Sequence, residues 1–367
     1  MYIRRLRTKN FRNYSELELE FYSGFNYIIG PNAVGKTNII EAISITSNSR
    51  SFRGVIDSDL IKWGETSYYC CSEVENNENS MFEIGCAIIN NRLKKRAKID
   101  GISINRTSDY YGRFLSVSLI PEDINIIMMT PDVRRRFFDG IISKIDKEYL
   151  INLKNFKKIL SSRNTLLKHK KQGMSLNYDE LDVWDTLFAD KANYIIKRRI
   201  EFLTRYKESF KQAYIDICKD DEHPNIEYLN TLNSIDKDDI INELLRNRKR
   251  DISIGSSSLG PQRDDYCLIN RRGVKFKNFA SQGQKRTATI SLKIAEYKFI
   301  ESETGKRSII LIDDIFSELD EERKKNMIKT FKDNEQVIVT MVENREIFKS
   351  DNYKVFQINS GGIVTEQ

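Results

Sequence analysis

The chain has 367 residues, 31% of them charged and 40% hydrophobic, with a formal net charge of +7. No apolar run approaches the roughly 18 residues that cross a membrane, and the N-terminus lacks the apolar stretch of a signal peptide. The five cysteines form no C-x-x-C pair, which favours reduced thiols over a zinc site or a disulfide framework. We therefore expect a soluble, cytoplasmic protein with room for two domains.

The segment around residue 30 predicts a strand, a phosphate-binding loop and a helix. Residues 25–29 form an apolar run, and from residue 37 the apolar positions follow one face of a helix. Between them the chain matches G-x-x-x-x-G-K-[ST] in full, with Gly30, Pro31, Asn32, Ala33, Val34, Gly35, Lys36 and Thr37. The two glycines let backbone N–H groups point at a phosphate. Lys36 would reach the β/γ oxygens and Thr37 would offer its hydroxyl to Mg²⁺, so this loop predicts nucleotide binding.

The middle of the chain predicts two long helices. Apolar residues recur every three or four positions from Phe138 to Leu160 and again from Leu181 to Ile217, with a turn at residues 172–175. Helices of roughly 35 to 40 residues would each span about 50 to 60 Å. Two interpretations fit this pattern. One is an antiparallel helical hairpin that projects as an arm, and the other is an ordinary helical subdomain whose apolar seam is its core.

A second apolar strand near the C-terminus ends in two carboxylates. Residues 308–312 lead directly into Asp313 and Asp314, which is the Walker B pattern. Asp313 can hold the Mg²⁺ shell and Asp314 can polarise the attacking water as a general base. The segment that follows, through Asp320, is similar to the D-loop of ABC-type ATPases.

A polar segment ahead of that strand looks like the ABC signature motif. It consists of Ser281, Gln282, Gly283 and Gln284 at the start of a predicted helix. Alone it could be an ordinary helix N-cap. Its position, 32 residues before Asp313 in a chain with a complete phosphate loop, favours the signature interpretation. Ser281 and Gly283 would then contact the γ-phosphate from an opposing subunit.

The spacing of the motifs separates two kinds of ABC-type ATPase. Lys36 and Ser281 are 245 positions apart, far more than a compact transporter subunit uses. We therefore expect an α/β ATPase head built from residues 1–130 and 250–367, with an α-helical arm at residues 131–249. A lone transporter ATPase subunit is the main alternative. Against it, Thr340 follows the strand after Walker B where transporters have a switch His, and the only histidines, His169 and His223, lie in the insert as expected surface residues. No Q-loop Gln can be placed, and Glu122 is only a guess for that region.

Motifs along nearly the whole chain resemble the RecF family of SMC-like ABC ATPases. The segments that carry the resemblance are Asn10–Tyr14, Asn32 with Gly35–Asn38, Glu41–Ile43, Arg50–Arg53, Pro121–Asp123, Arg134–Asp139, Arg163–Asn164, Trp184, and Gly260–Pro261 with Arg263–Asp265. The chain departs from the family pattern at Val34, where Gln is common, and at Gln262, where His is usual. The resemblance implies ATP and Mg²⁺ as cofactors, with Asn38 also at the nucleotide, and dimerisation on ATP. It further implies binding to single-strand gaps or duplex junctions in DNA, and assistance to RecO and RecR in loading the RecA recombinase. A DNA clamp with incidental ATP turnover is a second alternative.

Most of the net positive charge falls in the middle of the chain. Between Arg134 and Arg250 there are 25 Lys or Arg against 19 Asp or Glu, so +6 of the +7 falls on the predicted arm. The local clusters are Arg134–Arg136, Lys168–Lys171, Lys197–Arg199 and Arg246–Arg250, with Arg92–Arg96 on a predicted hairpin of the head. Each alone is typical of a solvated face. Together they could contact phosphates along a duplex, which would give binding without sequence specificity.

Overall fold

The computed structural model describes residues 1–76, 78–218, 224–342, 353–359 and 362–366. The chain forms two compact units, each assembled from separated segments. Unit 1 contains residues 1–124, 212–220 and 286–367, and unit 2 contains residues 125–211 and 221–285. His223 lies outside the described residues.

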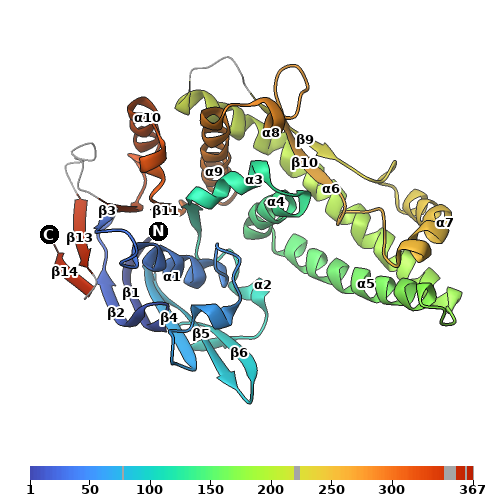
Figure 1. The fold of residues 1–367 in the computed structure, drawn as a ribbon, viewed down its shortest axis with the longest axis horizontal. Helices are drawn as coiled ribbons and strands as arrows, with labels where there is room; N and C mark the ends of the chain where they lie inside the picture. The colour runs from blue at the N-terminus through green and yellow to red at the C-terminus, as the bar shows by residue number, and fades with distance from the viewer. Residues whose placement is uncertain (77, 219–223, 343–352, 360–361, 367) are drawn as a thin grey trace. The chain divides into compact units, whose positions relative to one another are not determined.

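Unit 1 contains an antiparallel sheet with the strand order β2-β1-β4-β5-β6-β7 (Figure 1). Its strands are β1 (Tyr2–Phe11), β2 (Tyr14–Glu20), β4 (Ser67–Glu75), β5 (Asn79–Ile89), β6 (Arg92–Ile99) and β7 (Ile102–Ile104). Alternation along β5, where Phe82, Ile84 and Cys86 are buried and their neighbours are not, gives this sheet one core face and one outer face.

The second sheet of unit 1 is mostly parallel, with the order β14-β13-β3-β12-β11-β8. Its strands are β3 (Gly24–Ile29), β8 (Ser116–Leu119), β11 (Ile309–Asp313), β12 (Gln336–Met341), β13 (Tyr353–Asn359) and β14 (Gly362–Glu366), and only β14 is antiparallel to its neighbour. Every residue of β11 and β12 is buried, as expected for strands covered on both faces. Because β3, β12 and β11 are parallel neighbours, their carboxyl ends meet at one edge.

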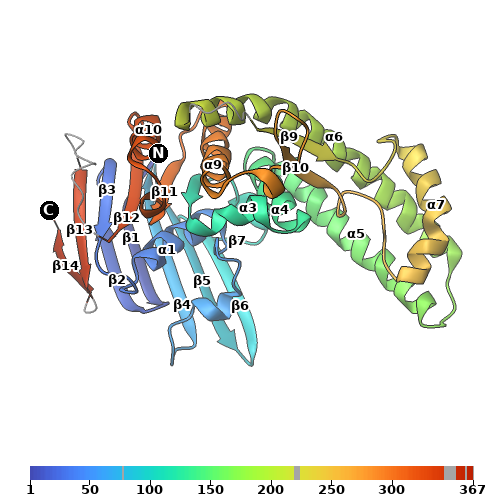
Figure 2. The ribbon, with the colours of Figure 1, turned by 45° about the horizontal axis from the view of Figure 1, so that its top comes forward.

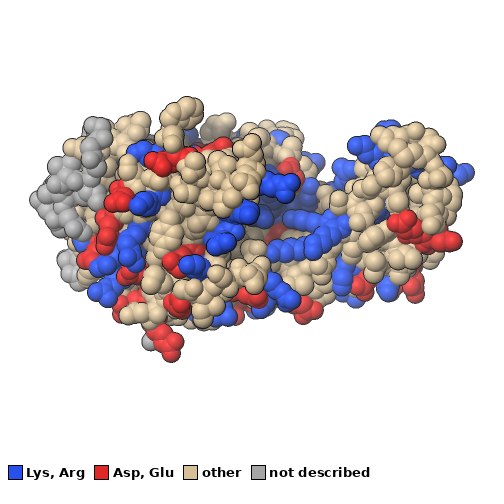
Figure 3. Space-filling view, turned by 90° about the horizontal axis from the view of Figure 1, so that it is seen from below, with Lys and Arg blue, Asp and Glu red and all other residues tan. Residues whose placement is uncertain are grey.

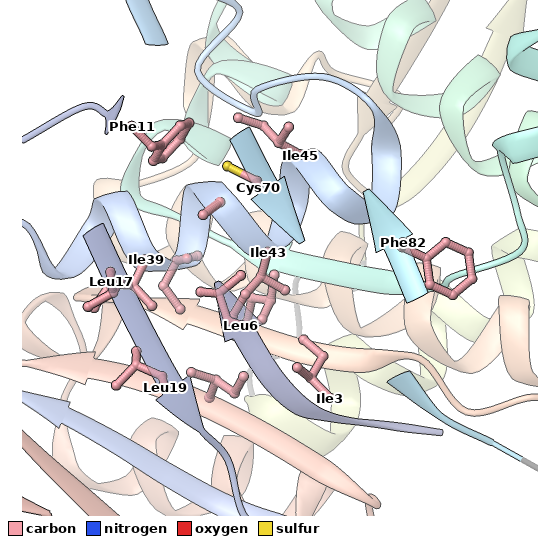
Figure 4. Close-up of a cluster of buried hydrophobic side chains, with 14 of the residues drawn as sticks. Ile3, Leu6, Phe11, Leu17, Leu19, Ile39, Ile43, Ile45, Cys70 and Phe82 are labelled. Atoms are coloured by element: carbon pink, nitrogen blue, oxygen red, sulfur yellow. The ribbon is translucent and has the colours of Figure 1, made fainter. Parts of the chain in front are cut away.

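Helix α1 (Lys36–Asn48) packs against strands of both sheets and completes the core of unit 1. Figure 4 shows Ile39 and Ile43 of α1 close to Leu17 and Leu6 of the antiparallel sheet, and Ile45 close to Cys70 of the same sheet. Because α1 is covered on most sides, its buried residues include Glu41, Ser44, Thr46 and Ser47 as well as the apolar residues of the predicted face. Among the described residues, unit 1 also contains the helical segments η1 (Asp57–Leu60), α2 (Thr107–Tyr110), η2 (Pro121–Ile124), the end of α6 (Tyr178–Ile217), most of α9 (Gln282–Thr304), η3 (Ile315–Glu318) and α10 (Glu321–Phe331).

Unit 2 is mainly helical and also contains a two-stranded antiparallel sheet (Figure 2). Its elements are α3 (Asn125–Met128), α4 (Pro131–Ile145), α5 (Lys147–Lys171), most of α6 (Tyr178–Ile217), β9 (Asn225–Leu229), α7 (Lys237–Ile254), β10 (Asp265–Ile269) and α8 (Phe276–Phe279). The rings of Phe156 on α5 and Phe188 on α6 lie 5.0 Å apart, so these two helices pack together across the predicted turn. α5 and α6 therefore form the helical pair that the sequence analysis expects, and packing of α5 on α4 and α7 and of α4 on β10 makes its apolar seam part of the core of unit 2.

The structure of the insert differs from the sequence analysis in two respects. The apolar pattern from Phe138 to Leu160 is not one helix, because Asp146 interrupts it with an extended backbone and caps α5 by accepting the N–H of Tyr149 at 2.9 Å. The unit boundaries also differ from 130 and 250. Residues up to 285 stay with unit 2 because β10 pairs with β9, whereas the end of α6 joins unit 1, where Asp216 pairs with Lys298 at 2.8 Å.

Candidate nucleotide site

The phosphate-loop segment connects the carboxyl end of β3 to α1, as the sequence predicts. Gly35 has a φ of 109° and sits at the N-cap of α1, a conformation that favours glycine. A Cβ at Gly35 would also lie 2.5 Å from the Asn13 side chain, and one at Gly30 would lie 2.2 Å from the carbonyl oxygen of Ile358. Both glycines are therefore required by close packing. Pro31, Asn32 and Ala33 are exposed, while Val34 and Asn38 are partly buried.

Lys36 is enclosed by the loop in which it lies. Its Nζ donates to the carbonyl oxygens of Gly30 and Pro31, both at 2.7 Å, and the residue is only 7% exposed. Burial lowers the pKa of Lys36, while the carboxylates of Asp314 and Asp313 act in the opposite direction. The structure therefore holds a desolvated ammonium group beside two carboxylates, which fits a residue whose intended partner is a phosphate.

Asp313, the last residue of β11, links the neighbouring strand β12 to the first turn of α1. Its Oδ1 accepts hydrogen bonds from Thr37 Oγ1 at 3.0 Å and from Thr340 Oγ1 at 2.6 Å. Burial raises the pKa of Asp313, and the two hydroxyl bonds and the charge of Arg53 only partly oppose it. A buried carboxylate next to a threonine hydroxyl is a set of hard oxygen donors suited to Mg²⁺, and a cation there would relieve its desolvation.

Asp314, the second predicted carboxylate, has a left-handed backbone with a φ of 48°. Aspartate tolerates this conformation better than most residues do. Its backbone N–H donates to Thr340 Oγ1 at 3.1 Å, so one threonine hydroxyl contacts both acidic residues. The sequence analysis noted Thr340 only as the place where a switch His is lacking. The signal that could have found its role is the pairing of Asp313 with Thr340 in parallel strands.

A polar network supports the phosphate loop from outside, and of its members sequence reasoning assigned a role only to Asn38. Asn13 Nδ2 donates to the carbonyl of Val34 at 3.1 Å, and Asn38 Nδ2 donates to Asn13 Oδ1 at 2.8 Å. Arg12 makes a two-pronged pair with the fully buried Glu41 of α1, both bonds at 2.8 Å. This fork ties the β1–β2 turn to α1 and thereby fixes the loop that α1 follows.

The remaining predicted site residues lie at helix starts. Ser281 and Gln284 form a reciprocal cap at the start of α9, with Ser281 N donating to Gln284 Oε1 at 2.8 Å and Gln284 N donating to Ser281 Oγ at 3.2 Å. Ser281 and Gln282 are exposed, Gly283 is partly buried, and all four signature residues belong to unit 2. Asp320 caps α10 in unit 1 by accepting the N–H of Arg323 at 2.9 Å.

Glu122, the guess for the Q-loop region, is exposed on η2. Asp123 beside it accepts the N–H of Ile120 at 2.9 Å, and burial raises its pKa to about 6.

Comparison with known proteins decides the family. The family model "RecF/RecN/SMC N terminal domain" matches residues 2–364. The DNA replication and repair protein RecF of Clostridium tetani is 34% identical over 369 residues, covering 98% of this chain and 99% of the relative. The RecF of Thermoanaerobacter sp. is also 34% identical, and the match covers both chains completely. The chain belongs to the RecF family.

Solved structures support the RecF family assignment and the α/β ATPase-head fold predicted from the motifs. A structure of the recombination mediator protein RecF with ATP, from the RecFOR pathway, matches 99% of this chain and 97% of its own, with a TM-score of 0.91 and 34% identity. An SMC head structure matches with a TM-score of 0.57 at 15% identity, which shows a shared fold only. Full-length likeness to RecF proteins leaves the transporter alternative without support. Among the described residues no helix is long and apolar enough to cross a membrane.

Proposed function

We propose that this chain is an ATP-driven switch of recombinational DNA repair. In this proposal it binds ATP with Mg²⁺, dimerises on ATP, and binds DNA at single-strand gaps or duplex junctions without sequence preference. It then assists RecO and RecR in loading the RecA recombinase. One observation carries the proposal of nucleotide binding: the hydroxyls of Thr37 and Thr340 both donate to Asp313, next to the phosphate loop.

In this proposal the residues of unit 1 have different roles at the nucleotide. Backbone N–H groups from Gly30 to Asn38 would surround the phosphates, and Lys36 would exchange its carbonyl partners for phosphate oxygens. Thr37 and Asp313 would hold Mg²⁺, which when bound would offset the charge of the β- and γ-phosphates. Asp314 would accept the proton of the attacking water as general base.

Slow turnover follows from the identity of Asp314, because many ABC ATPases carry Glu at this position. Aspartate is one methylene shorter, so without a compensating backbone shift its oxygen sits about 1 to 1.5 Å farther from the water, and such errors cost on the order of 100-fold in rate. We therefore propose a weak ATPase with a long-lived ATP-bound dimer, suited to timing on DNA.

Dimerisation on ATP is supported by the exposure of both halves of the composite site. Pro31, Asn32 and Ala33 of the phosphate loop and Ser281 and Gln282 of the signature loop are all accessible to a second copy. In the proposed dimer each ATP is bound by the phosphate loop of one subunit and by Ser281 to Gln284 of the other. Asp320, after η3, would lie near the same nucleotide.

DNA binding is supported by cations on the surface, and the structure removes several candidates. Arg134 pairs with Asp265 at 2.7 Å, Arg199 pairs with Asp139 at 2.9 Å, and Arg248 pairs with Asp185 at 2.6 Å, so these members of the basic clusters serve unit 2 internally. Figure 3 shows that Lys and Arg still gather in groups on one face of the molecule. Contacts from such side chains to phosphates give affinity without sequence specificity.

Light scattering tests the nucleotide, dimer and DNA claims together. The wild-type protein is sized alone, with ATP and Mg²⁺, and with ATP, Mg²⁺ and gapped DNA. We expect a monomer that becomes a dimer with ATP and a DNA-bound dimer in the third sample. The Lys36→Ala variant should stay monomeric throughout, and an ATP-independent dimer of either protein would contradict the switch.

The DNA-clamp alternative differs in needing no hydrolysis. A strain that carries Asp314→Asn, which keeps ATP binding but removes the proposed base, should fail to complement a repair defect if timed hydrolysis is required. Full complementation would favour the clamp.

A further inference from the structure

The outer face of β6 carries a row of positive side chains. Arg92, Lys94, Arg96 and Lys98 alternate along the strand and therefore share one face. Lys95 points to the opposite face, where its Nζ donates to Asp57 Oδ1 and to the carbonyl of Ser49, both at 2.7 Å. The first three residues of the row are exposed and Lys98 is partly buried.

The row differs from the other cations on the same face of this sheet. On β1, Arg5 pairs with Glu20, Arg7 pairs with Glu73 at 2.7 Å, and Lys9 pairs with Glu16 at 3.4 Å. Each of these three β1 cations thus has an acidic partner on a neighbouring strand.

The four β6 cations, in contrast, make no hydrogen bond or ion pair with any residue that the structure describes. Their cross-strand neighbours on β5 explain the difference. Arg92, Lys94 and Arg96 face Ile89, Ala87 and Gly85, which carry no charge. Lys98 faces Glu83, whose Oε1 already accepts the hydroxyl of Tyr69 at 2.6 Å. Among the described residues, the four cations therefore form no cross-strand ion pairs that would stabilise the sheet.

The row has the length and the surroundings of a binding surface for a polyanion. Alternate residues in a strand are about 6.7 Å apart, so the four charges span about 20 Å. Over that length one strand of duplex DNA presents roughly six phosphates. The small residues Ala87 and Gly85 border the row and leave its side chains unobstructed on that side. On the other side β7 pairs only with residues 97–99, so among the described residues no strand covers residues 92–96.

We propose that Arg92, Lys94, Arg96 and Lys98 on the outer face of β6 bind the phosphate backbone of duplex DNA. The inference rests on the proposed DNA-binding function and assigns it a site in unit 1, outside the predicted arm. Cations on an edge strand can also serve only to prevent edge-to-edge pairing with another chain. That role predicts self-association and no change in DNA affinity when the charges are removed, so experiment separates the two.

Fluorescence anisotropy with a short labelled duplex tests the site across a range of salt concentrations. The test variant is Arg92→Gln/Lys94→Gln/Arg96→Gln, and the matched control is Lys325→Gln/Lys329→Gln/Lys332→Gln, which removes three exposed charges from α10 and the turn after it. Each lost phosphate contact lowers the slope of log K against log salt by about 0.9. We expect the β6 variant to lose about 100-fold in affinity near 0.1 M salt, with a slope smaller by about 2 to 3. The α10 control should change far less.

The outcomes separate an error about the β6 site from an error about DNA binding by the chain. ATP affinity and melting temperature, measured on both variants, should match wild type. If wild type binds DNA and the β6 variant binds it with the same affinity and slope, the site is wrong and the DNA-binding function stands. If wild type binds no DNA of any form but sediments with phosphatidylserine vesicles, the function and the site are both wrong.

Discussion

Lys36 and Asp313 are oppositely charged groups that unit 1 holds out of water without pairing them directly. Lys36 is bonded to two carbonyls of its own loop, and Asp313 is bonded to two hydroxyls. In each case burial works against the charged form, lowering the pKa of Lys36 and raising that of Asp313. A ligand that contains phosphate groups and a bound cation would supply a partner for both charges.

Replacement of Lys36 tests the phosphate interaction. Lys36→Ala should weaken ATP binding on the order of 100-fold, because a charge-assisted contact to phosphate is lost. Lys36→Arg keeps the charge but not its shape, so it should impair hydrolysis more than binding. Isothermal titration gives the affinities and a phosphate-release assay gives the rates. Unchanged ATP affinity in Lys36→Ala would show that Lys36 does not contact the phosphates.

Replacement of Asp314 tests the general base. Asp314→Asn should slow hydrolysis by at least about 100-fold while Asp313 still holds Mg²⁺, so the ATP dimer should persist. Asparagine also tolerates the left-handed backbone at this position, so the variant should fold normally. Single-turnover kinetics provide the measurement. Wild-type rates would mean that another residue, near Thr340 or Glu122, activates the water.

At the scale of elements, buried charges organise the helices of unit 2. Arg163 on α5 is fully buried; its Nε donates to Asp185 of α6 at 2.6 Å, and its Nη1 donates to Asp251 of α7 at 2.8 Å and to Ser257 at 2.7 Å. One side chain thus joins three helices and the segment that follows them. The carboxylates of Asp185 and Asp251 need the cation of Arg163, because a buried carboxylate without a positive partner lowers the stability of the fold.

Arg163→Met should destabilise unit 2 by about 3 to 5 kcal/mol, since it leaves Asp185 and Asp251 buried without this partner. Arg250→Met on the exposed side of α7 is the matched control and should stay within about 0.5 kcal/mol of wild type. Urea unfolding followed by tryptophan fluorescence is suitable because Trp63 is 98% exposed, so the signal change reports mainly Trp184 on α6. Equal stability of the two variants would show that the cluster is dispensable.

At the scale of the whole molecule, the proposed function depends on a second copy of the chain. The exposed signature loop offers a way to separate nucleotide binding from assembly. Ser281→Arg should leave ATP binding to the monomer intact but prevent ATP-dependent dimers, because a bulky side chain would enter the opposing γ-phosphate site. Ser281→Ala removes the helix cap and the proposed hydroxyl contact to the phosphate but adds no bulk, so it should still dimerise, though less tightly. Normal ATP-induced dimers of Ser281→Arg in light scattering would refute the shared site.

The sequence by itself determined the elements whose geometry is local. The phosphate loop could be predicted because Gly30, Gly35 and Lys36 must stand at fixed spacing between a strand and a helix. Helix α6 could be predicted because its apolar period continues unbroken from Leu181 to Ile217. The break at Asp146 was missed, because the apolar period runs through it and a single capping residue overrides the pattern.

Tertiary structure alone decided which polar groups meet. Asp313 and Thr340 are 27 positions apart, and only parallel pairing of β11 with β12 makes them neighbours. The same holds for the basic clusters, which look alike in sequence. Arg199 is bonded to Asp139 from 60 positions away, whereas Arg96 faces Gly85 and keeps its charge for an external partner. Periodicity reports which side of an element is buried, but the partner of a charge is set by residues that only the folded chain brings within reach.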